Sequence, residues 1–223
     1  MCDQKYFEQV VFMPWEGSAF QQQKRKILFL GESHYGVGND VPDFTTEVIR
    51  RQFSEGQDQD QGRGFGVTKF HGNVFRTFSE FESSIDNRKT FWNTVAFYNF
   101  VQVGLESQSV RPTRVQFEDS VSAFCEVVCR LKPDVVVVLG LAVWDDLPID
   151  SRLNWTHVST HGVQSPTAAF KRSLELWRGN ASSNEVRHDF YCFFLPHPSW
   201  RSYGAAINWR EWPKAAFALI DNL

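Results

Sequence analysis

The chain has 223 residues, of which 42% are apolar and 15% aromatic, and its formal net charge at pH 7 is −3. This length and composition suit one globular domain with a sizeable core and exclude an intrinsically disordered chain. Because the net charge is slightly negative, no overall basic field marks a nucleic-acid-binding protein, and a polyanionic partner requires a local basic patch. No apolar run approaches the roughly 18 residues of a membrane span, and no signal peptide is recognisable.

The four cysteines, Cys2, Cys125, Cys129 and Cys192, form no C-x-x-C pair. The spacing of a zinc ribbon or an iron–sulfur cluster is therefore absent. Cys125 and Cys129 lie four residues apart in an apolar helical pattern, which is more typical of small buried hydrophobes than of metal ligands. We expect reduced thiols, a cytoplasmic location, no membrane partner, and neither a metal nor another cofactor.

The first marked element is the apolar run ILFLG at residues 27–31, which predicts a strand buried on both faces of a parallel sheet. The glycine at its end lets the backbone turn and lets a ligand approach closely. Four polar side chains follow directly: Glu32, Ser33, His34 and Tyr35. Ligands of open α/β sheets bind just outside the carboxyl ends of the strands, so these four residues stand where an active site is expected.

Helical and strand patterns then alternate. Thr45 is expected to cap a helix over residues 45–53, with Glu47 in its first turn. Residues 54–69 are rich in Gly, Gln and Asp and predict a surface loop. Apolar residues three and four apart predict a helix over 70–81, and an aromatic, β-rich run predicts a strand at 94–99.

The second half continues this alternation. One apolar face predicts a helix over 113–131, which Pro133 ends, and DVVVVLG at 134–140 predicts another buried strand. We expect short helices at 141–147 and 170–177, a loop at 179–184, a last buried strand at 191–195, and a terminal helix at 205–222 with a stop or kink at Pro213. The alternation predicts an α/β fold with a mainly parallel sheet, in a single domain spanning residues 1–223.

Each of three predicted strand ends carries polar side chains, and the carboxyl ends of parallel strands share one edge of a sheet. Beyond residues 32–35, the second strand end offers Asn93, Tyr98, Asn99 and Gln102, and the last offers His197 and Ser199, with Trp200, Arg201 and Tyr203 just beyond. A carboxylate, an amide and an imidazole that meet at this edge suit acid–base chemistry and the recognition of a base edge.

Two of these motifs resemble those of the uracil-DNA glycosylase superfamily. That superfamily has a glycine-led motif after its first core strand, of the form G-Q-D-P-Y or G-E-A-P-G, and a late H-P-S motif. Here Gly31-Glu32-Ser33-His34-Tyr35 stands in the first position and His197-Pro198-Ser199 in the second. The resemblance implies a three-layer α/β/α fold and a monofunctional DNA glycosylase that flips its target nucleotide and hydrolyses the N-glycosidic bond.

The resemblance also implies roles for individual residues. His197 would stabilise negative charge on the departing base, Asn99 would read the base edge, and Glu32 is the third catalytic candidate. Tyr35 would shape the pocket against a 5-substituent. The candidate base-binding set is Ser33, His34, Tyr35 and Asn93. The candidate DNA-binding set, which would enter the groove, is Ser199, Trp200, Arg201 and Tyr203.

The first motif departs from the superfamily at two positions. Ser33 stands where several members carry Asp or Asn to handle the water, and serine cannot act as a carboxylate base. Either Glu32 takes over, or water attacks a largely dissociated sugar cation with little help. His34 replaces the usual proline. We therefore expect a modified pyrimidine rather than plain uracil, a role in DNA repair or in defence against modified DNA, and a monomer.

Other interpretations stay open. The chain could be a nucleic-acid-binding module that has lost catalysis, which the departure at Ser33 favours. Ser33 and His34 could serve an esterase-type hydrolase, although a G-x-S-x-G elbow needs glycine where Tyr35 stands. Plainer interpretations also apply: Glu32 could pair with a basic side chain, Asn99 could cap a strand end, and His197 could be a buried structural histidine.

Overall fold

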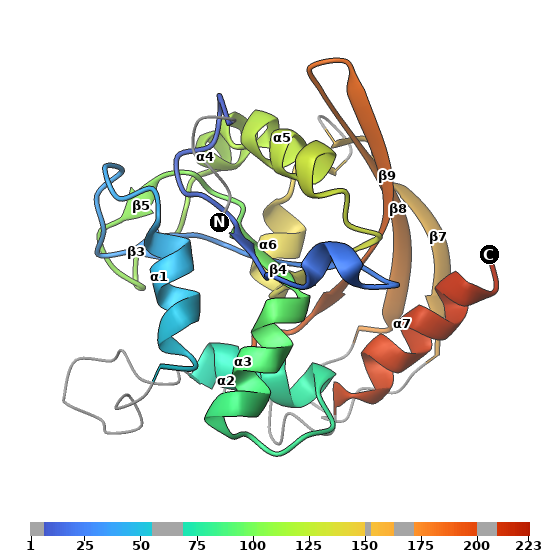
Figure 1. Ribbon diagram of the computed structural model, residues 1–223. Coiled ribbons are helices and arrows are strands. Elements are labelled where there is room, and N and C mark those ends of the chain that lie inside the picture. The colour runs from blue at the N-terminus through green and yellow to red at the C-terminus, as the bar shows by residue number, and fades with distance from the viewer. Residues whose placement is uncertain (1–6, 55–68, 150–152, 163–171, 200–208) are drawn as a thin grey trace.

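The computed structural model describes residues 7–54, 69–149, 153–162, 172–199 and 209–223 (Figure 1). In chain order, its elements are β1 (Trp15–Glu16), the 3-10 helix η2 (Phe20–Gln22), β2 (Ile27–Gly31), β3 (His34–Tyr35), α1 (Phe44–Arg51), α2 (Lys69–Phe78), α3 (Ile85–Thr94), β4 (Ala96–Asn99), β5 (Gly104–Leu105), α4 (Arg114–Asp119), α5 (Val121–Leu131), β6 (Val135–Leu139), α6 (Leu141–Asp146), β7 (Thr156–His161), β8 (Leu174–Ser183), β9 (Val186–Leu195) and α7 (Glu211–Asp221). The surface loop expected at 54–69 lies almost entirely outside these residues. No helix in the described part of the chain is both long and apolar enough to cross a membrane.

Seven strands form the central sheet, in the order β1-β4-β2-β6-β9-β8-β7. The four middle strands, β4, β2, β6 and β9, run parallel to one another, whereas β1, β8 and β7 pair antiparallel with their neighbours. A separate two-stranded ladder joins β3 and β5. The predicted α/β class is confirmed, and the sheet is mixed, with a parallel centre and antiparallel strands on both sides.

Helices cover both faces of the parallel centre. On one face, Phe29 of β2 contacts Phe78 of α2, with ring centroids 4.7 Å apart. The register places Phe193 of β9 on the same face, where it packs against α7. On the other face, the Phe194 ring lies 5.0 Å from Trp144 of α6. This alternation explains why the parallel strands read as continuous apolar runs, since both of their faces are buried.

Several helical predictions need correction. Thr45 lies inside α1, and Asp43 stands at the N-cap position instead. The helix expected over 113–131 is two helices, α4 and α5, which meet at Ser120. The Ser120 hydroxyl donates to the carbonyl of Gln116 at 2.7 Å and accepts from the Gln102 N–H at 3.0 Å, so it competes with the helical backbone there. Pro213 neither stops nor kinks α7, because it is the third residue of that helix, where an N–H has no helical acceptor.

The prediction for residues 172–184 was wrong. Residues 170 and 171 of the helix expected from 170 to 177 lie outside the described residues, and residues 174–177 begin β8 instead. The loop expected at 179–184 falls on β8 as far as Ser183, and β8 pairs antiparallel with β9. Gly179 belongs to the strand because the Phe190 ring fills the space of its missing side chain, where a Cβ would lie 2.5 Å from the ring. The hairpin turns at Asn184 and Glu185, whose positive φ angles of 46° and 65° are typical of a two-residue hairpin turn.

The two edges of the sheet differ from its centre. At one edge, β1 has only two residues. At the other edge, β7 has six residues, all partly or fully exposed, and its pairing with β8 shifts register between His157 and Ser159. Neither edge therefore offers a long, regular apolar strand.

Candidate functional site

The four parallel strands end along one edge of the sheet. Gly31 of β2 pairs in register with Asn99 of β4, and Leu139 of β6 pairs with Leu195 of β9. The motif at residues 32–35 and the motif at 197–199 therefore leave the sheet at the same edge, with β6 between their strands. Three strand spacings of about 4.8 Å separate β4 from β9, so their ends are roughly 14 Å apart.

Asn99 is held in one orientation by the turn after β2. Its Nδ2 donates to the Ser33 carbonyl at 3.0 Å and lies 3.1 Å from His34 Nδ1. Because a carbonyl can only accept, this contact fixes which end of the amide is nitrogen. The other end, Oδ1, lies over Gly31, where a Cβ would be only 2.2 Å from it. Position 31 therefore needs glycine to leave room for the amide oxygen.

His34 is a buried, neutral imidazole that positions this amide. Its ring lies among phenylalanine rings, with centroids 4.7 and 5.1 Å away, and burial lowers its pKa to about 4. Since Asn99 donates to Nδ1, the ring proton is on Nε2, which donates to Thr45 Oγ1 at 2.9 Å. Both ring nitrogens are thus engaged, and His34 is not placed to take a proton from Ser33.

His197 presents a hydrogen-bond donor at the other end of the edge. Its Nδ1 accepts from the Ser199 N–H at 3.2 Å, which leaves the proton on Nε2. The ring packs over Gly140, whose φ is +133°, and lies 5.1 Å from the Phe70 ring. Although the residue as a whole is exposed, burial of its ring and the positive charge of Arg111 lower its pKa. The imidazole is therefore neutral at pH 7.

Aromatic rings link the two ends of the edge. Phe70, in the first turn of α2, contacts His197 on one side and Phe97 of β4 on the other, with ring centroids 5.1 and 6.2 Å away. Phe97 precedes Asn99 by two residues, so both side chains lie on the same face of β4. His71 packs beside them, 5.4 Å from Phe97. The span between His197 and Asn99 is thus bordered by aromatic surface.

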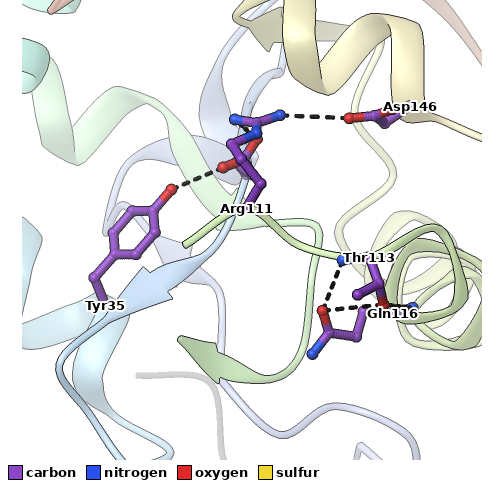
Figure 2. Close-up of polar contacts among 6 residues, drawn as sticks. Tyr35, Arg111, Thr113, Gln116 and Asp146 are labelled. Carbon is purple, nitrogen blue, oxygen red and sulfur yellow. Dashed lines mark hydrogen bonds and ion pairs between the residues drawn. The ribbon is translucent and has the colours of Figure 1, made fainter. Parts of the chain in front are cut away.

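Glu32 lies in a separate network of polar and charged groups, whose other members, Tyr35, Arg111 and Asp146, are labelled in Figure 2. Its side chain is only 7% exposed and forms an ion pair with Arg111, with 2.5 Å between Oε1 and Nη1. The Tyr35 hydroxyl donates to Oε2 at 2.7 Å. Burial is the main cause of a raised pKa of Tyr35, which Ser33 partly opposes and the carboxylate of Glu32 reinforces, so the phenol stays protonated. Arg111 Nη2 also lies 3.4 Å from Asp146 Oδ2 of α6.

Sequence reasoning missed Arg111 as a site residue. It stands in the loop before α4, two residues ahead of Thr113, which caps that helix in a reciprocal pair with Gln116 (Figure 2). Its only local signal is a positive charge beside a capping motif, and such residues are normally solvated. The chain reversal that brings it to Glu32 is not visible in the sequence. The pairing of Glu32 with a basic side chain, one of the plainer interpretations, is what the structure contains.

The remaining predicted residues have other positions. Asn93 lies near the end of α3, before β4 begins, and lines a cavity of about 140 Å³ away from the carboxyl edge. Tyr98 is fully buried in the core. Gln102 is structural, because its Oε1 accepts from two backbone N–H groups of the N-terminal segment. Ser199 follows His197 and is exposed, whereas Trp200, Arg201 and Tyr203 lie outside the described residues.

Within the described residues, the function of this site is indicated neither by a metal centre nor by a match to a family model or a curated protein. Across the described ranges, no group of three or more His, Cys, Asp or Glu side chains could hold a metal ion. Cys129 and Cys192 are buried, and burial raises the pKa of both thiols. No protein-family model and no curated protein matches the sequence.

Proposed function

We propose that this chain is a monofunctional DNA glycosylase with the fold of the uracil-DNA glycosylase superfamily. It would hydrolyse the N-glycosidic bond of a flipped, modified pyrimidine in DNA. The arrangement of the two motifs supports this proposal. The glycine-led motif follows β2, the H-P-S motif follows β9, and both stand at the carboxyl edge with only β6 between their strands. Asn99 is the last residue of β4, the neighbour of β2 on the other side.

The observation that carries the proposal is the state of His197. A neutral imidazole with its proton on Nε2 donates one hydrogen bond and adds no positive charge. When the C1′–N bond of a nucleotide breaks, the bonding electrons stay with the base, whose oxygen or nitrogen atoms become negative. A donor fixed beside those atoms stabilises the charge as it develops. Phe70 beside this ring supplies an apolar surface for the base.

The orientation of Asn99 supports a particular class of base. Both N–H groups of its amide face protein acceptors, the Ser33 carbonyl and His34 Nδ1, so Oδ1 is the atom left for a substrate. An acceptor pairs with an N–H group of the base. The exocyclic amino group of a cytosine-type base provides that donor. Uracil can also donate, through N3–H, but its neighbouring carbonyl oxygens find no donor in this amide. A modified cytosine is therefore the favoured substrate.

Glu32 limits how the water is activated. Its Oε1 forms an ion pair with Arg111 and its Oε2 accepts from Tyr35, so the carboxylate is already committed to protein partners and is a poor candidate for activating water. The step that fits is a largely dissociated one. The base leaves with the bonding electrons, water adds to C1′ of the sugar cation and loses a proton to solvent, and the base anion takes up a proton from solvent. The products are the free base and an abasic site.

The second candidate is a binding module on the same fold without catalysis. The engagement of Glu32 favours it, because neither Glu32 nor Ser33 then provides a free carboxylate base. An esterase-type hydrolase built on Ser33 is disfavoured, since both nitrogens of His34 are engaged by Asn99 and Thr45.

A base-release assay tests the proposal. Single- and double-stranded oligonucleotides would carry uracil, a thymine mismatch, 5-hydroxymethylcytosine or glucosylated cytosine, and alkaline cleavage would reveal abasic sites. We expect release of at least one modified cytosine, a loss of about 100-fold or more in His197→Ala, and a similar loss in Asn99→Ala. The control is His188→Ala. His188 belongs to β9, and its ring forms a hydrogen bond with the Pro133 carbonyl. Absence of abasic sites with every substrate, together with retained salt-sensitive DNA binding, would support the binding module instead.

A further inference from the structure

A second ligand site adjoins the network around Glu32. We infer that Arg111 binds a backbone phosphate of the nucleic acid, and that the carboxylate of Asp146 occupies this place in the free protein. The inference rests on the proposed function, because the phosphate belongs to the strand that carries the target base.

The two sides of the Arg111 guanidinium have different partners. Nη1 lies 2.5 Å from Glu32 Oε1, and the Glu32 side chain is 7% exposed. Only Glu32 is buried, since the Arg111 side chain is 50% exposed, but loss of Arg111 would leave the Glu32 charge buried and uncompensated, which is unfavourable. The Tyr35 hydroxyl holds the second oxygen of Glu32 and fixes its orientation. Arg111 is thus anchored firmly on its inner side.

The outer side is held loosely. Nη2 lies 3.4 Å from Asp146 Oδ2, and both side chains are 50% exposed. Solvent-exposed ion pairs of this length contribute little to stability, and salt weakens them further. Another oxyanion can therefore replace Asp146 at small cost, while the ion pair with Glu32 keeps the guanidinium in place.

A phosphodiester fits the group that becomes available. A planar guanidinium donates two parallel N–H bonds to a phosphate as readily as to a carboxylate. Arg111 is also close enough to the catalytic edge for its charge to lower the pKa of His197. A nucleotide whose base reaches that edge carries phosphates on both sides of its sugar. Arg111 is well placed to hold one of them.

The test measures how the affinity for DNA depends on salt. Fluorescence anisotropy of a labelled single-stranded oligonucleotide would be recorded from 50 to 250 mM KCl for the wild type and Arg111→Gln. Loss of one phosphate contact lowers the slope of log Kd against log salt by about 0.7 for a single strand. The matched control is Arg178→Gln, which removes the same charge from an exposed ion pair. The strand pairings place Arg178 of β8 in register with Ile27, the first residue of β2. Arg178 therefore lies toward the opposite end of the sheet from the proposed site.

A second variant predicts the opposite change. Asp146→Asn removes the competing carboxylate, so affinity at low salt should rise about two- to fivefold, and the rise should vanish when Arg111→Gln is also present. The control is Asp145→Asn, which neutralises the neighbouring residue of α6 and frees Arg172 instead. If Arg111→Gln unfolds, the variant Glu32→Gln/Arg111→Gln removes the buried charge as well and is measured in its place.

The outcomes separate the two proposals. Salt-sensitive binding with the wild-type slope in both Arg111 variants, and no gain from Asp146→Asn, would overturn the inference and leave the proposed function standing. No DNA binding by the wild type would overturn both. If inorganic phosphate alone then raised the melting temperature in an Arg111-dependent way, the site would bind free phosphate, which also overturns the inference.

Discussion

Acid should destabilise this protein through two buried histidines, His34 and His71. Burial lowers the pKa of His34 to about 4 and that of His71 to about 3, and the charge of His34 contributes to the latter shift. In the unfolded chain the pKa of a histidine is about 6.5. Between pH 6.5 and pH 4 the unfolded chain therefore binds protons that the folded chain does not. Stability that is complete above pH 6.5 is lost as the pH falls through this range.

The size of the loss follows from the unfolded pKa. At pH 5 an unfolded histidine lies about 1.5 pH units below its pKa, which corresponds to about 2 kcal/mol for each group. Both residues are less than 10% exposed, so solvent does not screen the effect. Because both folded pKa values lie well below 5, the result depends little on their exact positions. The two histidines together should lower the free energy of unfolding by about 4 kcal/mol between pH 8 and pH 5.

Urea unfolding at pH 8, 6 and 5 would measure this loss. In His71→Gln, the pH-dependent part should shrink by about 2 kcal/mol, whatever the variant does to stability at pH 8. Phe75→Leu, in the same helix and equally buried, is the control, because it should lower stability by the same amount at every pH. A wild-type loss below about 1 kcal/mol, or an unchanged loss in His71→Gln, would refute the reasoning.

Two further changes test other parts of the structure. In Gly31→Ala, the new Cβ clashes with Asn99 Oδ1, so the free energy of unfolding should fall by about 1–3 kcal/mol. Base release should fall as well, and normal base release in this variant would contradict the proposed role of the Asn99 amide in binding the base. In Glu126→Ala, the backbone N–H groups of Glu8 and Gln9 lose their charged acceptor, at 2.7 and 2.8 Å. We expect a loss of about 3 kcal/mol and faster proteolysis of the N-terminal segment, with Glu126→Gln milder, and equal proteolysis rates would contradict this.

The parallel centre of the fold could be predicted from the sequence because burial on both faces leaves a plain signal. The run VVVVL at 135–139 has no polar residue, and β6 spans the same residues. The β8 strand could not be predicted in this way. Its residues include Gly179, Asn180 and two serines, which usually indicate loops, and its pairing with β9 overrides that preference. Likewise, the break at Ser120 depends on a bond to Gln102, which is distant in sequence.

In the candidate site, too, some residues could be placed from the strand pattern, whereas their partners could not. Residues attached to predicted strand ends, such as Asn99 and His197, stand at the edge that the strand pattern indicates. Asn93 was grouped with Asn99 from sequence proximity, but the helix α3 extends to Thr94 and keeps it before the strand begins. The partners that decide the chemistry of Glu32 come from distant segments, with Arg111 in the loop before α4. Such partners follow from the packing of whole elements rather than from local pattern.

The blunt edges of the sheet have a consequence for how copies of this protein meet. A sheet grows by adding strands to an unpaired edge, and long, flat, apolar edges recruit other chains. Here one edge is a two-residue strand, and the other is a polar strand bent by its register shift at His157. Neither provides a continuous row of backbone groups onto which a second sheet could dock. Copies of this protein can therefore reach a high local concentration without their sheets joining edge to edge.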